Sequence, residues 1–192
     1  MAKSTVRNVL FITADQWRGD TLGAVGHPCV KTPNLDRLAA DGMLFGKHYT
    51  QATPCSPGRA SLLTGLYMFN HRVVFNGVPL DRRFTNLALE VRKAGYDPVL
   101  VGYTSTAPDP RTLEPGDPRL ETYEGVLPGL KQIANDTTSW LAWLNWRGIE
   151  GLKKPADAYM QVPNYPGAEK RGYTYSPPAY SAEESDTAFA AG

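Results

Sequence analysis

The chain has 192 residues, which is enough for one domain with its own hydrophobic core. Hydrophobic residues make up 42% and charged residues 20%, a composition typical of globular proteins. The formal net charge is +1 without a basic block, and no apolar run approaches ~18 residues, so we expect neither a nucleic-acid partner nor a membrane partner. Two cysteines, Cys29 and Cys55, are too few for a disulfide framework, and we therefore predict a reducing, cytoplasmic location.

The first part of the chain alternates between strand-like and helix-like patterns. The apolar run at residues 9–14 (VLFITA) predicts a strand buried on both faces, and it lacks the small-residue cleavage site of a signal peptide. This alternation is typical of an α/β fold with a largely parallel sheet. The remaining predicted elements are helices at 32–42, 57–68 and 86–94, a strand at 43–49 and a second buried strand at 98–103.

The later part of the chain has a looser pattern, because ten of the 16 prolines follow residue 105. A helix is expected at 136–146, and we interpret Trp140, Trp143 and Trp146 as its packed face rather than as a binding platform. Residues 153–180 show no clear period. A second helix is expected from Ser181, which is a good N-cap followed by two glutamates.

The segment at 53–61 (TPCSPGRAS) carries the most chemistry. Cys55 stands directly before a predicted helix, whose N-terminal N–H groups and positive dipole end attract anions. That position favours the thiolate form of a cysteine, and a tetrahedral oxyanion would be held by the same groups together with Arg59. The alternative is an inert buried thiol beside a surface arginine. A tyrosine-phosphatase-type loop is disfavoured, since it places Cys and Arg six positions apart rather than four.

Asp15 and Gln16 form a second polar pair, directly after the predicted first strand. Open α/β sheets bind their ligands beyond the carboxyl ends of their strands. A carboxylate and an amide oxygen together suit a hard cation such as Ca²⁺, Mn²⁺ or Mg²⁺. Taken alone, however, the pair fits equally well a turn capped by Asp15 with a solvated Gln16.

Four motifs in the same order resemble the sulfatase family of the alkaline phosphatase superfamily. Residues 55–59 (CSPGR) fit the signature C-x-P-x-R, and ASLLTG follows them as it does in sulfatases. The DQ pair after an apolar strand and KTPNLDRL at 31–38 are also similar to that family. The match covers about residues 8–105. It implies an alkaline phosphatase-like, three-layer α/β sandwich with a largely parallel sheet, of which these residues would build an incomplete part.

The resemblance also implies a domain organisation. Residues 1–105 are predicted to be the N-terminal sulfatase-type α/β core with the nucleophile and the first metal motif. Residues 106–192 are predicted to be a Pro- and aromatic-rich excursion of the same domain, truncated before the second metal-ligand set of the family. Since no second Asp-His or Asp-Asn pair here could match that set, we expect the chain alone to be inactive. Whether the full-length protein forms a homo-oligomer is left open.

The resemblance implies a mechanism that begins with a formylglycine-generating enzyme, which converts Cys55 to formylglycine. One hydroxyl of the hydrated aldehyde, activated by the metal, attacks the sulfur or phosphorus of a small-molecule ester and expels an alcohol or phenol. The second hydroxyl then loses its proton, and sulfate or phosphate leaves. By position, Cys55 and Arg59 would be catalytic, and Asp15, Gln16 and Cys55 would be metal ligands.

One departure from the family pattern points to a branch. Most sulfatases carry a Lys-x-His pair in G-K-W-H, where this chain has GYTS at 102–105. Tyr103 and Ser105 at these positions resemble phosphonate monoester hydrolases, which carry G-Y-T-T and then T-P-D-P-R. Asn76 also resembles that branch, so Asn76, Tyr103 and Ser105 are predicted to bind substrate. The loss of a lysine would favour singly charged phosphonate monoesters, phosphodiesters or sulfate monoesters over a phosphate dianion.

Two other functions stay open. One is an arylsulfatase-type sulfuric ester hydrolase. The other is a catalytically inactive fragment or relic that keeps the fold, although an intact C-x-P-x-R around Cys55 favours an enzyme. His71 has no nameable partner in the sequence and is expected to be structural.

Overall fold

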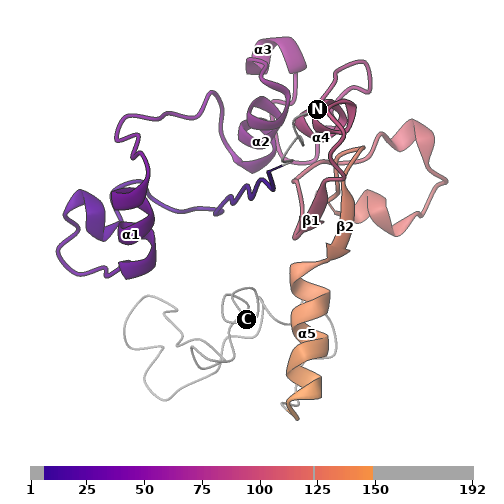
Figure 1. The fold of residues 1–192 in the computed structure, drawn as a ribbon. Helices are drawn as coiled ribbons and strands as arrows, with labels where there is room; N and C mark the ends of the chain where they lie inside the picture. The colour runs from indigo at the N-terminus through magenta and orange to yellow at the C-terminus, as the bar shows by residue number, and fades with distance from the viewer. Residues whose placement is uncertain (1–6, 123, 149–192) are drawn as a thin grey trace, which may run out of the picture. The chain divides into compact units, whose positions relative to one another are not determined.

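The fold is described from a computed structural model, which describes residues 7–122 and 124–148 (Figure 1). The chain divides into two compact units, Met1–Thr50 and Gln51–Gly192, and each is described by itself. Within the described ranges, no helix is long and apolar enough to cross a membrane. Neither Cys29 nor Cys55 forms a disulfide within the described ranges.

The first unit is organised around a short 3-10 turn, η1 (Gly23–Val25), and the helix α1 (Pro33–Asp41), which confirms the helix predicted at 32–42. Two polar side chains tie them together. The hydroxyl of Thr32 accepts from the backbone N–H of Gly23 at 2.8 Å and donates to Asp36 Oδ1 at 2.8 Å. Asp36 Oδ1 also accepts from the next N–H of η1, at 2.7 Å.

The strands predicted at residues 9–14 and 43–49 are not formed. Val9, Leu10 and Ile12 are 77%, 84% and 73% exposed, so the prediction of a strand buried on both faces is wrong for this structure. A strand requires a neighbouring strand that takes up its backbone N–H and C=O groups, and the described residues pair neither segment in a ladder. An apolar run indicates that a segment is to be buried, but it does not indicate which other segment packs against it.

The second unit opens with three helices, α2 (Cys55–Thr64), α3 (Met68–His71) and α4 (Leu87–Lys93). The helix predicted at 57–68 begins two residues earlier and divides at Gly65, whose left-handed backbone (φ 71°) ends α2. The helix predicted at 86–94 is confirmed as α4. It is capped by the side chain of Asn86, which accepts from the N–H of Leu89 at 3.1 Å.

Two parallel strands, β1 (Val99–Val101) and β2 (Lys131–Ala134), form the sheet. The parallel pairing agrees with the predicted α/β class, and β1 confirms the strand predicted at 98–103. Sequence reasoning missed β2, because its residues KQIA are not an apolar run. The expected burial of β1 is wrong, since Val99 and Val101 are 55% and 56% exposed.

The chain between the strands passes through two 3-10 turns, η2 (Pro110–Thr112) and η3 (Pro118–Glu121), capped by Asp109 and Asp117. Each turn begins with a proline, which suits the first helical position because it has no N–H to satisfy. These turns account for part of the loose, proline-rich pattern after residue 105.

The helix predicted at 136–146 is confirmed as α5 (Asp136–Trp146), which follows β2 directly (Figure 1). Its tryptophans do not form one packed face, since Trp140 is buried whereas Trp146 is 81% exposed. The helix predicted from Ser181 and the region at 153–180 lie outside the described residues.

Among the described residues, the buried apolar side chains come from the second unit, where α2 packs against α3 and α4 (Figure 1). They are Ala60, Val73, Ala88, Ala107, Leu127, Trp140 and Leu144. This core fixes the N-terminal turn of α2 beside the segments that follow α3 and β1. The predicted domain division at residue 105 stays a prediction.

Candidate functional site

Cys55 is the first residue of α2 and is half-buried. The residue before it, Pro54, supplies no side-chain cap, so a side chain from elsewhere takes that place. Asn76, in the segment after α3, accepts through Oδ1 a hydrogen bond of 2.9 Å from the backbone N–H of Ser56. Asn76 therefore holds the first turn of the helix that carries Cys55.

Arg59 lies one turn beyond Cys55, on the same side of α2. Its Nη1 donates to the backbone carbonyl of Tyr103 at 2.8 Å, and its guanidinium lies 4.7 Å from the centroid of the Tyr103 ring. A guanidinium over an aromatic face is attracted by the ring quadrupole. One residue thus fixes the arginine through both its backbone and its side chain.

The segment that follows β1 carries backbone strain. Gly102 has φ 94° and its N–H donates to the carbonyl of Ala134 at 2.9 Å, while Ser105 has φ 58°. A left-handed conformation is uncommon for a residue with a side chain, and such strain concentrates at functional sites. Ser105 is also 2% exposed, and among the described residues its hydroxyl has no hydrogen-bond partner. The hydroxyl of Ser56 is buried in the same way.

A backbone contact brings the two loops of the site together. Pro79 and Ala107 form an isolated parallel bridge, which joins the segment after Asn76 to the segment after Ser105. The structure therefore associates Cys55 and Arg59 on α2 with Asn76, Tyr103 and Ser105 on two connected loops.

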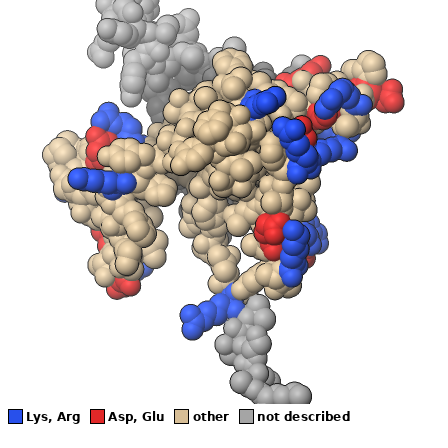
Figure 2. All heavy atoms as spheres, turned by 90° about the horizontal axis from the view of Figure 1, so that it is seen from above, with Lys and Arg blue, Asp and Glu red and all other residues tan. Residues whose placement is uncertain are grey.

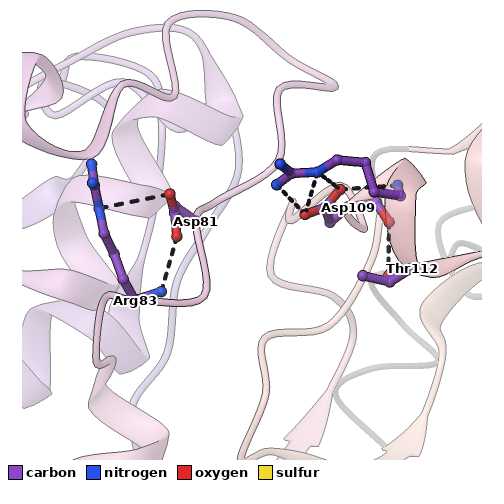
Figure 3. Close-up of polar contacts among 5 residues, drawn as sticks. Asp81, Arg83, Asp109 and Thr112 are labelled. Atoms are coloured by element: carbon purple, nitrogen blue, oxygen red, sulfur yellow. Dashed lines mark hydrogen bonds and ion pairs between the residues drawn. The ribbon is translucent and has the colours of Figure 1, made fainter.

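Two acid–base pairs lie on these loops, beyond the bridge (Figure 3). Asp81 is paired with Arg83, and Asp109 with Arg111 through bonds of 2.9 Å to Nε and 2.6 Å to Nη2. Hydrogen bonding from Arg111 lowers the pKa of Asp109 to about 2. Figure 2 shows that acidic and basic side chains also lie beside one another elsewhere on the surface.

His71 is 2% exposed and connects α3 to α2. Its Nδ1 accepts from the N–H of Val73 at 3.0 Å, and its Nε2 lies 2.9 Å from the hydroxyl of Ser61. Because Nδ1 accepts, the proton of the neutral ring is on Nε2, which donates to Ser61. Burial lowers the pKa of His71, which favours this neutral form. These contacts agree with the structural role expected for His71.

Asp15 and Gln16 lie at an exposed turn of the first unit, where Gln16 has φ 54°. A carboxylate and an amide oxygen provide the donor chemistry of a hard cation, so the pair fits as part of a metal site. Within the described part of the chain, no group of three or more His, Cys, Asp or Glu side chains could hold a metal by itself. The association of this pair with Cys55 stays a prediction.

The sulfatase family model matches residues 7–146, which is most of the chain. The chain belongs to the sulfatase family. Its motifs around Asp15, Lys31 and Cys55 all fall within the matched range. The resemblance inferred from those motifs is therefore confirmed.

Two proteins similar to this sulfatase-family chain show how much of a relative's length it covers. It is 46% identical over 156 residues to a multifunctional alkaline phosphatase superfamily protein of Trinickia caryophylli, covering 79% of this chain and 30% of that protein. It is 39% identical over 104 residues to an arylsulfatase of Clostridium perfringens, covering 53% of this chain and 21% of that protein. The chain thus spans about a third or less of the length of these relatives.

Two solved structures are similar to this chain, and both are phosphonate monoester hydrolases. The enzyme of Agrobacterium radiobacter is 53% identical with a TM-score of 0.76, over 92% of this chain and 35% of that one. The enzyme of Silicibacter pomeroyi is 42% identical with a TM-score of 0.77, over 95% of this chain and 36% of that one. The alkaline phosphatase-like α/β fold class is confirmed by these neighbours.

Sequence reasoning missed Thr104 in the GYTS segment at 102–105. Its side chain is buried, and its hydroxyl accepts from the N–H of Leu127 at 2.8 Å and donates to the carbonyl of Gly125 at 3.0 Å. The signal was present, because a threonine stood between two predicted site residues. Its partners lie more than 20 positions away and cannot be read from spacing.

Proposed function

We propose that this chain is the nucleophile-bearing part of a metal-dependent hydrolase of phosphonate monoesters and phosphodiesters, with a formylglycine made from Cys55. The observation that carries the proposal is the contact between Arg59, in the C-x-P-x-R motif, and Tyr103, in the motif that replaces the Lys-x-His pair. The identity of 53% to a phosphonate monoester hydrolase over 92% of this chain supports the same branch.

The side chains on the described loops have distinct roles in this proposal. The amide oxygen of Asn76 stays on the N–H of Ser56, which leaves its NH₂ group to donate to an oxygen of the ester. Ser105 offers a buried hydroxyl without a partner among the described residues, which suits a second contact to the ester. Tyr103 holds Arg59 and lines the same region.

Charge selects the substrate in the proposal. Arg59 and the N-terminus of α2 attract an anion, whereas Tyr103 and Ser105 bring no positive charge where most sulfatases have lysine and histidine. With less positive charge in the site, the binding of a dianion is weakened more than that of a singly charged ester, which shifts the preference towards the singly charged ester. Phosphonate monoesters and phosphodiesters carry that single charge, as sulfate monoesters do.

Asp15 and Gln16 would hold the divalent metal together with the oxygen of the modified Cys55. When bound, the metal would supply Lewis-acid activation of the formylglycine hydroxyl and positive charge for the ester oxygen. Ca²⁺, Mn²⁺ and Mg²⁺ all accept such oxygen donors. The formylglycine-generating enzyme is the one macromolecular partner that the proposal requires, and a cytoplasmic location is proposed with it.

Two measurements on the natural full-length protein test the proposal. After co-expression with the maturation enzyme, mass spectrometry of the peptide around Cys55 is expected to find an aldehyde in place of the thiol. The matured protein is then assayed on phenyl phosphonate monoesters, phosphodiesters and aryl sulfates with the same leaving group. The matched control is Cys55→Ala, which should lose all three activities, and chelation should have the same effect.

The observation that supports the arylsulfatase alternative is the identity of 39% to an arylsulfatase. The same rates decide between the two, because a large preference for the aryl sulfate would overturn the choice of phosphonates and diesters. Unmodified cysteine together with no hydrolysis of any ester would instead favour the inactive relic. The chain of 192 residues by itself is expected to stay inactive in these assays.

A further inference from the structure

We infer that Thr104 and Gly125 are positioning residues for Arg59, acting through the peptide group that joins Tyr103 to Thr104. The inference rests on the proposed function for its effect on rate, but its geometric part does not. Neither residue is among the predicted catalytic, substrate or metal residues, and neither contacts α2 in any bond described above.

The peptide group between Tyr103 and Thr104 is held from both sides. Its C=O accepts from Nη1 of Arg59 at 2.8 Å, and its N–H donates to the carbonyl of Gly125 at 3.0 Å. A peptide group is planar, so fixing the N–H also fixes the direction of the C=O. The carbonyl of Gly125 therefore determines where Arg59 finds its acceptor. Hydrogen bonds arranged in such a chain also polarise and strengthen one another.

The hydroxyl of Thr104 locks this arrangement. It donates to the same carbonyl of Gly125 at 3.0 Å and accepts from the N–H of Leu127 at 2.8 Å. The hydroxyl of Thr106 lies 3.0 Å away and adds a third contact. Because Thr104 is 5% exposed, water cannot readily replace these bonds when the hydroxyl is removed.

Gly125 is required at its position by space. A Cβ built on it would lie 2.1 Å from the backbone carbonyl oxygen of Thr106, a distance that no side chain can occupy. Only glycine allows the two backbones to approach closely enough for the Gly125 carbonyl to reach the N–H of Thr104. A side chain here would push the 125–127 segment away from the loop that holds Arg59.

The consequence for catalysis is the placement of one charge. An untethered arginine side chain samples many rotamers, and ordering it costs conformational entropy. The carbonyl and ring of Tyr103 impose that order before any substrate arrives. Misplacing a catalytic group by about 1 Å can lower a rate by ~100-fold. Loosening the peptide group should therefore lower kcat.

The geometric arm of the test observes the guanidinium directly, in full-length protein carrying ¹⁵N-arginine, with the Arg59 signals assigned through Arg59→Lys. Restricted rotation about the Cζ–Nη1 bond is expected in the wild type and in Thr104→Ser, which keeps the hydroxyl. Faster rotation is expected in Thr104→Val, which keeps the volume but loses the hydroxyl. Equal rotation in the wild type and Thr104→Val would overturn the inference, whether or not the protein is active.

The kinetic arm is a double-mutant cycle in the matured protein. Thr104→Val is expected to lower kcat by about 10- to 100-fold, while Thr104→Ser and the control Thr112→Val, at an exposed hydroxyl of η2, stay within about threefold of the wild type. In an Arg59→Ala background, Thr104→Val should have little further effect. An undiminished effect in that background, or none in the wild type, would overturn positioning through Arg59.

The two arms separate this inference from the proposed function. If no ester is hydrolysed but the guanidinium rotation changes as expected, the proposed function fails while the positioning of Arg59 stands. If esters are hydrolysed but the rotation does not change, the reverse holds. The stability of each variant is measured by urea denaturation, so that Thr104→Ser serves as the folded comparison if Thr104→Val unfolds.

Discussion

Replacing His71 separates its two hydrogen bonds, one to Ser61 of α2 and one from the N–H of Val73 just after α3. In His71→Asn, the side-chain oxygen can keep the place of Nδ1 and accept from Val73, but the buried hydroxyl of Ser61 loses its donor. In His71→Gln, the amide can still reach Ser61, while the N–H of Val73 is left unsatisfied. Each orphaned buried group costs ~1–3 kcal/mol, so His71→Ala should lower the free energy of unfolding by about 3–6 kcal/mol, including the cavity.

The same residue predicts how stability depends on pH. Burial lowers the pKa of His71 below its ordinary value of 6.5, so the unfolded chain binds a proton at a higher pH than the folded chain does. The contribution of neutral His71 to the free energy of unfolding should therefore be complete above pH 6.5. It should decrease as the pH falls from there towards the lowered pKa. One proton gives a slope of at most ~1.4 kcal/mol per pH unit. Protonation also places a hydrogen on Nδ1, opposite the N–H of Val73.

The assay is urea denaturation followed by far-ultraviolet circular dichroism at several pH values between 7.5 and 5. The wild type should lose stability below pH 6.5, whereas His71→Asn and His71→Gln should start lower and show a flatter dependence. His48→Gln is the matched control, because His48 is an exposed histidine and its loss should leave the wild-type slope. If His71→Asn keeps the slope of the wild type, the neutral, hydrogen-bonded histidine described here is wrong.

Three further predictions concern the supports around the site. Gly125→Ala should lower the free energy of unfolding by at least ~2 kcal/mol in urea denaturation, because its Cβ would overlap the backbone of Thr106. Asn86→Ala should lower it by about 2–3 kcal/mol, because it removes both the cap of α4 and the bond from Nδ2 to the carbonyl of Pro128. Asp109→Asn should reduce the acid sensitivity between pH 4 and 2, since the pKa of Asp109 is about 2 when folded and its stabilising effect is lost as the pH falls through that window.

Matched variants serve as controls for these predictions. Gly46→Ala introduces a Cβ that meets nothing within 4 Å and should stay within ~0.5 kcal/mol of the wild type. Asn86→Asp keeps the capping oxygen but loses the donor to Pro128, so its effect should be smaller than that of Asn86→Ala. If Gly46→Ala lowered the free energy of unfolding as much as Gly125→Ala does, the steric explanation would be contradicted. If the acid transition of Asp109→Asn were the same as that of the wild type, the ion pair of Asp109 with Arg111 would not stabilise the fold.

Local signals predicted the helices well, because their start and stop chemistry lies within the elements themselves. Pro33 at the start of α1 and Asn86 before α4 were readable, and α5 matches its predicted range. The strands were less predictable, because a strand depends on a neighbour far away in the sequence. The run at 9–14 is apolar yet unpaired, whereas the polar segment of β2 is paired.

The candidate site shows the same contrast between local features, which could be predicted, and long-range contacts, which could not. The sequence pattern placed Cys55 directly before a helix, and the structure instead makes it the first residue of α2, one turn from Arg59. Family resemblance predicted that Asn76 and Tyr103 bind substrate, but the bonds they make to α2 could not be read from residue types. The support from Gly125 was invisible, because a glycine in a loop gives no indication of which backbone approaches it.

The unpaired run at 9–14 also affects how the chain behaves at high concentration. Its six residues, VLFITA, combine strand-forming side chains with neither charge nor proline, and its apolar side chains are exposed. Segments of this kind readily add a second copy as a neighbouring strand. The yield on expression should therefore depend more on how quickly this run is buried than on the free energy of unfolding. The substitution Ile12→Lys should raise the protein concentration at which aggregation begins.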